Sequence, residues 1–483
     1  MRKRHRINTL SKVFIIVVML ALVGAGFLLR RYVFPIPATE TSFAEAVEIA
    51  EMPSDADLKL TKQSAEPPSE TEVVTESTPG LMSESASVPT SGFMSESASE
   101  STSEPETESS SEPASETAQE STSEPTQAQI TSSISPAVKD LAAKRAAEML
   151  TDMTLYEKVC QMLIVIPDSI TNVSGTTVAG EITKSALEKY PVGGLILMSS
   201  NITGDEQVIN FNNNVQKYSK IPLFLSCDEE GGRVDRLKTL SDAPNVTAMF
   251  SYRNNGTDTA FDNAVTLSKS LKHYGFNTNF APVADVWSNP SNTVIGDRAF
   301  SDDFEQAAEL VGAAVSGFAS ESVICSLKHF PGHGNTSQDS HYVTAYIGKT
   351  LEELRGQELV PFRTGINAGA DMVMIGHLMV KEIDDKPATL SHKIVTGVLR
   401  DEMGYEGVII TDALNMQAMT RYYTNAEIAV QAVRAGIDIL LAPADVSGTV
   451  GAILAAIGDG SIDEERIDAS VLRILTLKNL KML

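Results

Sequence analysis

The chain is poor in cysteine and in aromatic residues, with three cysteines, one tryptophan and 6% aromatic residues among 483 positions. The cysteines are widely separated, so they form neither a Cys-x-x-Cys pair nor a spacing typical of zinc sites. A chain of this length does not need a disulfide framework to stabilise its core. Each cysteine lies in an apolar run, which predicts buried free thiols at Cys160, Cys227 and Cys325.

Basic residues are also scarce, with 38 lysines and arginines against 63 aspartates and glutamates and a net charge of −25. Between Thr39 and Ser135 there are two basic and 20 acidic residues, so about −18 of this charge lies there. The amino-terminal end carries seven positive charges, which leaves about −14 on the remainder. An acidic domain without a basic stripe is a poor candidate for binding nucleic acid, and neutral sugars or cationic groups fit it better.

Long apolar runs are scarce, and the one that stands out lies near the amino terminus. The uncharged run from Val13 to Leu29 follows five basic residues and precedes Arg30 and Arg31. This pattern is typical of a secretory signal, either cleaved or retained as a membrane anchor. The absence of a clear cleavage site favours an uncleaved transmembrane helix, with the positive amino terminus in the cytoplasm. We therefore expect the rest of the chain to be anchored on the extracellular face of a bacterial cell membrane, or secreted.

The next segment, from Thr39 to Ser135, has too few apolar residues to offset the entropy of ordering. It is rich in Ser, Glu, Thr and Pro, and the sequence Met82–Ser87 recurs at Met94–Ser99. Self-repelling glutamates and scattered prolines predict an extended, disordered spacer. The predicted organisation is therefore a basic segment with a signal-anchor helix over 1–38, a disordered linker over 39–135 and a catalytic barrel over 136–483.

Short continuous apolar runs alternate with helical patterns from Ser135 onward, as expected for parallel strands that are buried on both faces. The eight expected strands are Gln161–Ile166, Gly193–Met198, Pro222–Asp228, Thr278–Asp285, Val323–Phe330, Ala370–His377, Gly407–Asp412 and Ile439–Ala442. Expected helices include Asp262–Tyr274, Asp303–Ser320 and Thr350–Ala368, the last opening with a capping box. Eight such units predict an α/β fold of the (β/α)₈ TIM-barrel type, with a doubly wound open sheet as the alternative.

Several of these strands end in ionisable residues, where a barrel enzyme carries its chemistry. They are Asp228, Asp285, Lys328, His329, His377 and Asp412. Asp412 directly follows a buried strand, so it is placed either to act as a nucleophile or to cap the next segment. Pro331 and Gly332 disfavour a helix that would join His329 and His333 on one face, which argues against a metal site there.

Downstream of this loop, Asp339 and His341 are two residues apart. In an extended or turn segment, a carboxylate at that spacing can orient an imidazole as a proton donor and acceptor near neutral pH. The alternative is a turn in which Asp339 caps the backbone and His341 is merely exposed. The spacing alone does not separate the two readings.

Five segments together resemble family 3 glycoside hydrolases of the single-domain β-N-acetylhexosaminidase type. They are DEEGGRVDR (228–236), NFAPVADV (279–286), IGDRAF (295–300), KHFPGHG with DSH (328–334 and 339–341) and ITDALNM (410–416). The resemblance runs from about Ala146 to the carboxyl terminus. The Asp-Ser-His loop is its most specific part, because other family members place their acid/base on a second domain. Glu229 departs from the pattern, since many relatives carry an amide there.

The resemblance implies a role for each of these residues. Asp412 would be the nucleophile, and His341 the general acid/base oriented by Asp339. The residues that would bind the hydroxyl and N-acetyl groups of the sugar are Asp228, Arg236, Arg298, Lys328 and His329. By the same resemblance, His333 and Asp285 are expected to be structural partners of these groups rather than direct ligands.

The implied activity is that of a retaining exo-β-N-acetylglucosaminidase, which acts on peptidoglycan-derived or chitin-like sugars through a covalent glycosyl-enzyme. No metal or organic cofactor is required. The alternatives are a β-glucosidase of the same family, an N-acetylglucosaminide phosphorylase, and a surface sugar-binding protein without catalysis. The expected partners are therefore an N-acetylglucosamine-containing carbohydrate and, through the amino-terminal helix, the membrane, but no nucleic acid.

Overall fold

The computed structural model describes residues 135–337 and 345–483. The predicted anchor, nearly all of the predicted linker, and the segment 338–344 lie outside the described residues. Within the described ranges, no helix combines the length and the apolar character that crossing a membrane requires. The predictions of an anchor and a spacer therefore stay predictions.

Eight parallel strands form the centre of the described fold, one in each of the predicted apolar runs. They are β1 (Leu163–Val165), β2 (Gly194–Ile196), β3 (Phe224–Cys227), β6 (Thr278–Asn279), β7 (Ile324–Phe330), β9 (Met372–Ile375), β11 (Val408–Thr411) and β12 (Leu440–Leu441). Every residue of these strands is buried, which explains why the runs are continuously apolar instead of alternating.

The strands follow one another around a nearly closed barrel in the order β11-β9-β7-β6-β3-β2-β1-β12. Representative register pairs are Ile164 with Gly194 in β1 and β2, and Ile409 with Val373 in β11 and β9. A parallel bridge between Ile410 and Ile439 joins the two ends of the sheet. Because β11 and the segment of β12 meet in this way, the sheet has no open ends. The open doubly wound sheet is therefore excluded, and the arrangement is that of a TIM-type barrel.

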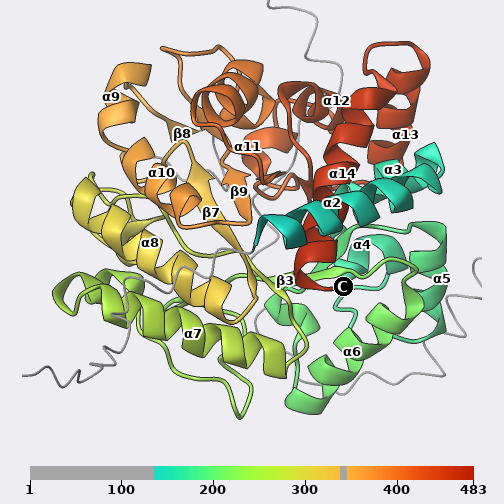
Figure 1. The fold of residues 1–483 in the computed structure, drawn as a ribbon, viewed down its shortest axis with the longest axis horizontal. Coiled ribbons are helices and arrows are strands. Elements are labelled where there is room, and N and C mark those ends of the chain that lie inside the picture. The colour runs from blue at the N-terminus through green and yellow to red at the C-terminus, as the bar shows by residue number, and fades with distance from the viewer. Residues whose placement is uncertain (1–134, 338–344) are drawn as a thin grey trace, which may run out of the picture. The chain divides into compact units, whose positions relative to one another are not determined.

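Helices connect successive strands and surround the barrel (Figure 1). They are α2 (Pro136–Thr151), α3 (Leu155–Gln161), α4 (Pro167–Thr171), α5 (Glu181–Lys189), α6 (Asp205–Tyr218), α7 (Thr257–His273), α8 (Phe304–Ser320), α9 (Leu351–Gly356), α10 (Leu359–Asn367), α11 (Gln417–Thr420), α12 (Asn425–Ala435), α13 (Val446–Gly458) and α14 (Glu464–Lys481), with a π-helical segment at Lys393–Glu402. Figure 1 shows α7, α8 and α10 packed side by side on one flank, and α12, α13 and α14 together on another. One continuous core fills the barrel and the layer between strands and helices.

Two short ladders lie at the carboxyl-terminal side of the barrel. A hairpin follows β3 and consists of β4 (Glu229–Gly231) paired antiparallel with β5 (Val234–Asp235). Further along the chain, β8 (Ala345–Tyr346) pairs with β10 (Leu378–Met379). Both ladders belong to loops that follow barrel strands, which is where enzymes of this architecture place their specific residues.

Two predicted elements differ in extent from the structure. The expected helix Thr350–Ala368 is two helices, α9 and α10, because the chain turns at Gln357 and buries the side chain of Glu358, which pairs with Lys349. The capping box at Thr350 is confirmed. The expected strand Thr278–Asp285 has regular pairing at its start, in β6, and one further bridge, between Val283 and Lys328; between them Pro282 has no N–H to donate to a ladder. All three cysteines are buried and unpaired, as predicted.

The first described helix, α2, packs against the last one, α14. The two helices at the ends of the described chain are therefore in contact. Helix α2 contacts α14, and the side chain of Ser135 accepts a hydrogen bond from the N–H of Val138 at the start of α2. Pro136 occupies the first helical position, where its missing N–H costs nothing. Residue 135 is therefore a defined helix start.

Candidate active site

A cavity of about 450 Å³ opens at the carboxyl-terminal ends of the strands. All eight strands contribute to its wall, either directly or through the residues that follow them; β6 contributes through Thr293, Val294 and Arg298. The wall includes six residues that the sequence predicted for the site: Asp228, Arg236, Arg298, Lys328, His329 and Asp412. The fold thus gathers residues from positions up to 184 apart in the sequence into one space.

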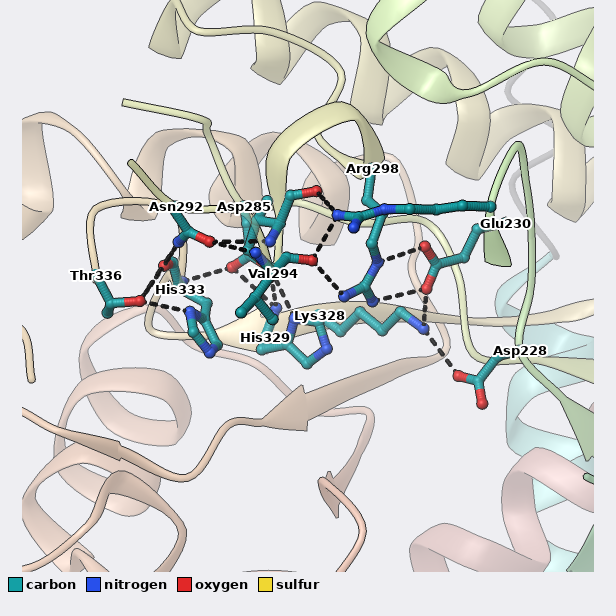
Figure 2. Close-up of polar contacts among 12 residues, drawn as sticks. Asp228, Glu230, Asp285, Asn292, Val294, Arg298, Lys328, His329, His333 and Thr336 are labelled. Carbon is teal, nitrogen blue, oxygen red and sulfur yellow. Dashed lines mark hydrogen bonds and ion pairs between the residues drawn. The ribbon is translucent and has the colours of Figure 1, made fainter. Parts of the chain in front are cut away.

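The polar side of the cavity is a chain of ion pairs centred on Glu230 (Figure 2). Arg298 donates to both oxygens of Glu230, at 2.8 Å each, through Nε and Nη2. Lys328 Nζ lies 2.6 Å from Glu230 Oε1 and 2.9 Å from Asp228 Oδ1. The other oxygen of Asp228 lies 3.5 Å from Nη2 of Arg236.

These pairs keep Glu230 and Lys328 charged although both side chains are buried. The Lys328 and Glu230 side chains are 2% and 1% exposed. Burial alone would raise the pKa of Glu230, but Arg298 and Lys328 hold it well below its usual range. For Lys328 burial would lower the pKa, and the carboxylates of Asp228 and Glu230 reverse that and raise it. The result is a set of donors and acceptors in which every cation contacts a carboxylate.

Next to this chain, Asp285 organises the loop that carries the two histidines. Its Oδ2 lies 2.7 Å from Nδ1 of His329, and its Oδ1 accepts the backbone N–H of His333 at 2.6 Å. Burial raises the pKa of Asp285, but the His329 imidazole outweighs it, so the net shift is downward. Asp285 is therefore a structural partner, as predicted.

His333 differs in part from its prediction, because it also lines the cavity. Its Nδ1 lies 2.8 Å from the Thr336 hydroxyl, and burial lowers its pKa to about 4. At neutral pH this imidazole is uncharged. Asn292 donates to its backbone oxygen at 2.8 Å, beside Thr336, and so also holds the loop (Figure 2).

Asp412 directly follows β11 and lines the cavity. Its backbone N–H donates to Ile375 of β9 at 2.9 Å, and its Oδ1 accepts the N–H of Ala413 at 2.7 Å. His377 does not line the cavity. Instead its Nε2 donates to the carbonyl of Ala413 at 2.9 Å, and the Thr389 hydroxyl lies 2.7 Å from its Nδ1. His377 thus holds the turn on which Asp412 sits.

The model of the glycosyl hydrolase family 3 N-terminal domain matches residues 154–477, which span all eight strands and the whole described cavity wall. The chain belongs to glycosyl hydrolase family 3. This finding confirms the resemblance on which the sequence prediction rested.

Relatives of this family 3 chain include named β-hexosaminidases. β-Hexosaminidase A of Pseudoalteromonas piscicida is 33% identical over 333 residues, which cover 63% of this chain and 56% of that protein. A β-hexosaminidase of Stenotrophomonas maltophilia is 34% identical over 251 residues, covering 51% of this chain and 74% of that protein. The chain therefore spans little more than half the length of the first relative and about three quarters of the second.

A solved structure shares the fold as well. The family 3 β-N-acetylglucosaminidase of Paenibacillus sp. str. FPU-7 superposes with a TM-score of 0.64 at 36% identity. The superposition covers 68% of this chain and 63% of that one. The shared part is the barrel, since the described residues begin only at 135.

Two predicted catalytic residues of this family 3 domain, Asp339 and His341, lie outside the described residues. Their segment leaves the cavity loop after Ser337 and rejoins the described chain at β8. Their proposed roles stay predictions.

The sequence reasoning did not include Glu230 among the site residues, although it is the centre of the ion-pair chain. A signal was present, because Glu230 lies inside the DEEGGRVDR segment and is followed by two glycines. Its partners Arg298 and Lys328 are 68 and 98 residues further on, so the pairing is visible only in the folded chain.

Proposed function

We propose that this chain is a retaining exo-β-N-acetylglucosaminidase of the β-N-acetylhexosaminidase type. The observation that carries the proposal is the position of Asp412, a carboxylate at the wall of a sugar-sized cavity beside Asp228, Lys328 and the His329 loop. A volume of about 450 Å³ lies in the range of small-molecule sites. The named activities of the relatives support N-acetylhexosamine as the glycone.

In the proposed mechanism the Asp412 carboxylate attacks the anomeric carbon, and the bond from that carbon to the leaving oxygen breaks. His341, oriented by Asp339, donates a proton to the leaving oxygen. A water molecule then attacks the same carbon while His341 takes up its proton, and the bond to Asp412 breaks. Two inversions give a product with the configuration of the substrate.

The remaining predicted residues suit the binding of neutral hydroxyl and amide groups. Asp228 offers carboxylate oxygens as acceptors, while Lys328 and Arg236 offer N–H donors from the same wall. Arg298 and His329 complete the polar side, and both are held by buried carboxylates. A hydroxyl can donate to a carboxylate and accept from a cation at once, so paired charges of this kind recognise sugars.

The pairing of charges favours hydrolysis over phosphorolysis. Each arginine and lysine of the described cavity wall lies within 3.5 Å of a carboxylate, including Arg233, which pairs with Asp297 at 2.9 Å. A phosphate acceptor would need a cation that does not already contact a carboxylate. Water, being neutral, needs none.

The natural substrate that we propose is a peptidoglycan-derived or chitin-like sugar met outside the cell. This part rests on the basic amino terminus, the apolar run Val13–Leu29 and the acidic segment that follows. An enzyme held on the outer surface of the membrane, or secreted, would meet such glycans.

The test compares nitrophenol release by the purified full-length chain from the β-N-acetylglucosaminide and from the β-glucoside, with and without inorganic phosphate. Preference for the N-acetyl sugar, unchanged by phosphate, supports the proposal. Preference for glucose, or strong stimulation by phosphate, would replace it with one of the alternatives. NMR of the first sugar released decides retention, because a retaining enzyme liberates the β-anomer before mutarotation.

A further inference from the structure

The β4–β5 hairpin presents two cavity residues, so its shape sets their positions. Glu230 belongs to β4, Arg236 directly follows β5, and both line the cavity. In the register of this hairpin, Glu229 stands opposite Asp235. Two acidic residues therefore face each other across the hairpin that carries Glu230.

Glu229 is 3% exposed, and both its side chain and its backbone form hydrogen bonds. Its Oε2 accepts the backbone N–H groups of Arg236 at 2.9 Å and Leu237 at 3.2 Å. Its own backbone is held by Asn279, which donates to its carbonyl at 2.8 Å and accepts its N–H at 3.0 Å. One side-chain oxygen thus closes the hairpin, and the other is left for Asp235.

The carboxyl groups of Glu229 and Asp235 are neighbours across the hairpin, within range of a shared hydrogen bond. Asp235 Oδ1 is buried and accepts no N–H group or hydroxyl from the described residues. Two carboxylates in contact cannot both be ionised, so a proton must lie between them. Burial, followed by the charge of Asp235, raises the pKa of Glu229 to about 8, which places the proton on Glu229 at neutral pH.

We propose that Glu229 is a positioning residue: as a neutral carboxylic acid it donates a hydrogen bond to Asp235, and this bond holds the hairpin that presents Glu230 and Arg236 to the sugar. Glu229 then uses one oxygen as an acceptor and the other as a donor, as a side-chain amide would. It touches neither the cavity nor the substrate, and it acts through its neighbours in the hairpin.

No cation among the described residues replaces that proton. Arg236 directs its guanidinium to Asp228, and neither Glu229 nor Asp235 forms an ion pair in the part of the chain that the structure describes. The titratable group packed against Glu229 from β3 is the thiol of Cys227, and burial raises the pKa of Cys227 well above its usual value, so it stays neutral. From β6, Glu229 meets only the uncharged Asn279.

The shared proton makes the stability of the fold depend on pH. The folded chain keeps this proton up to about pH 8, whereas the unfolded chain releases it near the ordinary value of 4.5. The folded state therefore binds more protons between these two values, and the free energy of unfolding falls as pH rises through them. Above this window, two adjacent carboxylates repel each other and loosen the hairpin.

The first arm of the test measures the thermal midpoint of the full-length chain from about pH 5 to about pH 9, across the window in which the proton is lost. Glu229→Gln cannot ionise but can still donate to Asp235, so its midpoint should fall less with pH than that of the wild type. Glu309→Gln, an exposed glutamate on α8, is the matched control and should follow the wild type. Equal falls in Glu229→Gln and the wild type would overturn the inference.

The second arm measures KM and kcat for the nitrophenyl N-acetylglucosaminide, and it rests on the proposed function. Glu229→Met removes the side-chain hydrogen bonds to Arg236, Leu237 and Asp235 and should raise KM about tenfold or more with a smaller change in kcat, because it displaces binding groups. Glu229→Gln should rescue KM to within about threefold of the wild type at the same pH. If Glu229→Gln is as impaired as Glu229→Met, the shared proton does not position the hairpin. An inactive wild type would reject the proposed function, and the first arm would still decide this inference.

Discussion

Asp412 is the residue on which the proposed chemistry depends most directly. Asp412→Ala should lower kcat by roughly four orders of magnitude or more, because no other group can form the glycosyl-enzyme. The fold should survive, since the hydrogen bond that Asp412 accepts from the N–H of Ala413 contributes only about 1 kcal/mol. Steady-state turnover and a thermal melt measure the two effects. Hydrolysis within tenfold of the wild type would remove Asp412 from the nucleophile role.

His341 is tested through the leaving group. His341→Ala should reduce kcat/KM for a natural disaccharide by about 10²–10⁴-fold, because an alkoxide leaves poorly without a proton. For a nitrophenyl glycoside the first step needs no protonation, so the formation of the glycosyl-enzyme should be much less affected. His273→Ala, which removes a half-exposed imidazole on α7, is the control. Equal losses on both substrates in the pre-steady state would assign His341 another role.

At the scale of residues, the sequence predicted the site residues at the ends of strands well, but it did not predict which residues they contact. Asp228, Lys328 and Asp412 were predicted because each directly follows or ends a buried apolar run. Glu230 was not, since its importance comes from contacts with Arg298 and Lys328 that only the closed barrel creates. The distinction between His333 and His377 was likewise beyond the sequence, because both are buried imidazoles and only one lines the cavity.

The loop that follows β7 provides the prediction at the scale of elements. A Cβ on Gly334 would lie 1.7 Å from the backbone oxygen of Val286, so Gly334→Ala must displace one of these two backbones. We expect a loss of activity of at least tenfold, because the shift moves the loop that carries His333. Gly348 is the matched control beyond the same loop, since no described atom lies within 4 Å of its added Cβ. Equal activity in Gly334→Ala and Gly348→Ala, measured with the nitrophenyl substrate, would contradict this.

Helix and strand patterns predicted the presence of elements better than their limits. All eight strands formed where continuous apolar runs occur, because burial on both faces dictates that composition. The break between α9 and α10 could not be read locally, since it depends on burying Glu358 against Lys349. The short extent of β6 has a local cause instead, since Pro282 has no N–H to donate to a ladder.

For the whole molecule, the boundary of the folded part can be tested by truncation. A chain starting at Ser135 should be soluble and as active as the full-length chain, because Ser135 supplies the cap of α2 and α2 packs against α14. A chain starting after α2, at Met153, should be less stable, since it removes the partner of α14. Denaturant titration and turnover distinguish them. An insoluble or inactive chain from Ser135 would mean that the preceding segment is part of the fold.

The closure of the barrel could be predicted only from the number of strand–helix units. Eight strand–helix units in about 340 residues suggested a ring, but the sequence contains no local signal that β11 and β12 meet. That contact comes from the accumulated tilt and twist of all the strands. The predicted anchor and spacer rest on composition alone and fall outside the described residues.

The ion pairs of the cavity also determine how this protein responds to its surroundings. The chain as a whole carries −25, and added salt screens such a charge over a distance of roughly 8–10 Å. Inside the cavity, however, Glu230 is already neutralised by Arg298 and Lys328 at contact distance, where mobile ions do not enter. An uncharged sugar displaces no counterions when it binds there. Sugar capture should therefore proceed equally well in dilute and in saline media, while the acidic exterior governs solubility.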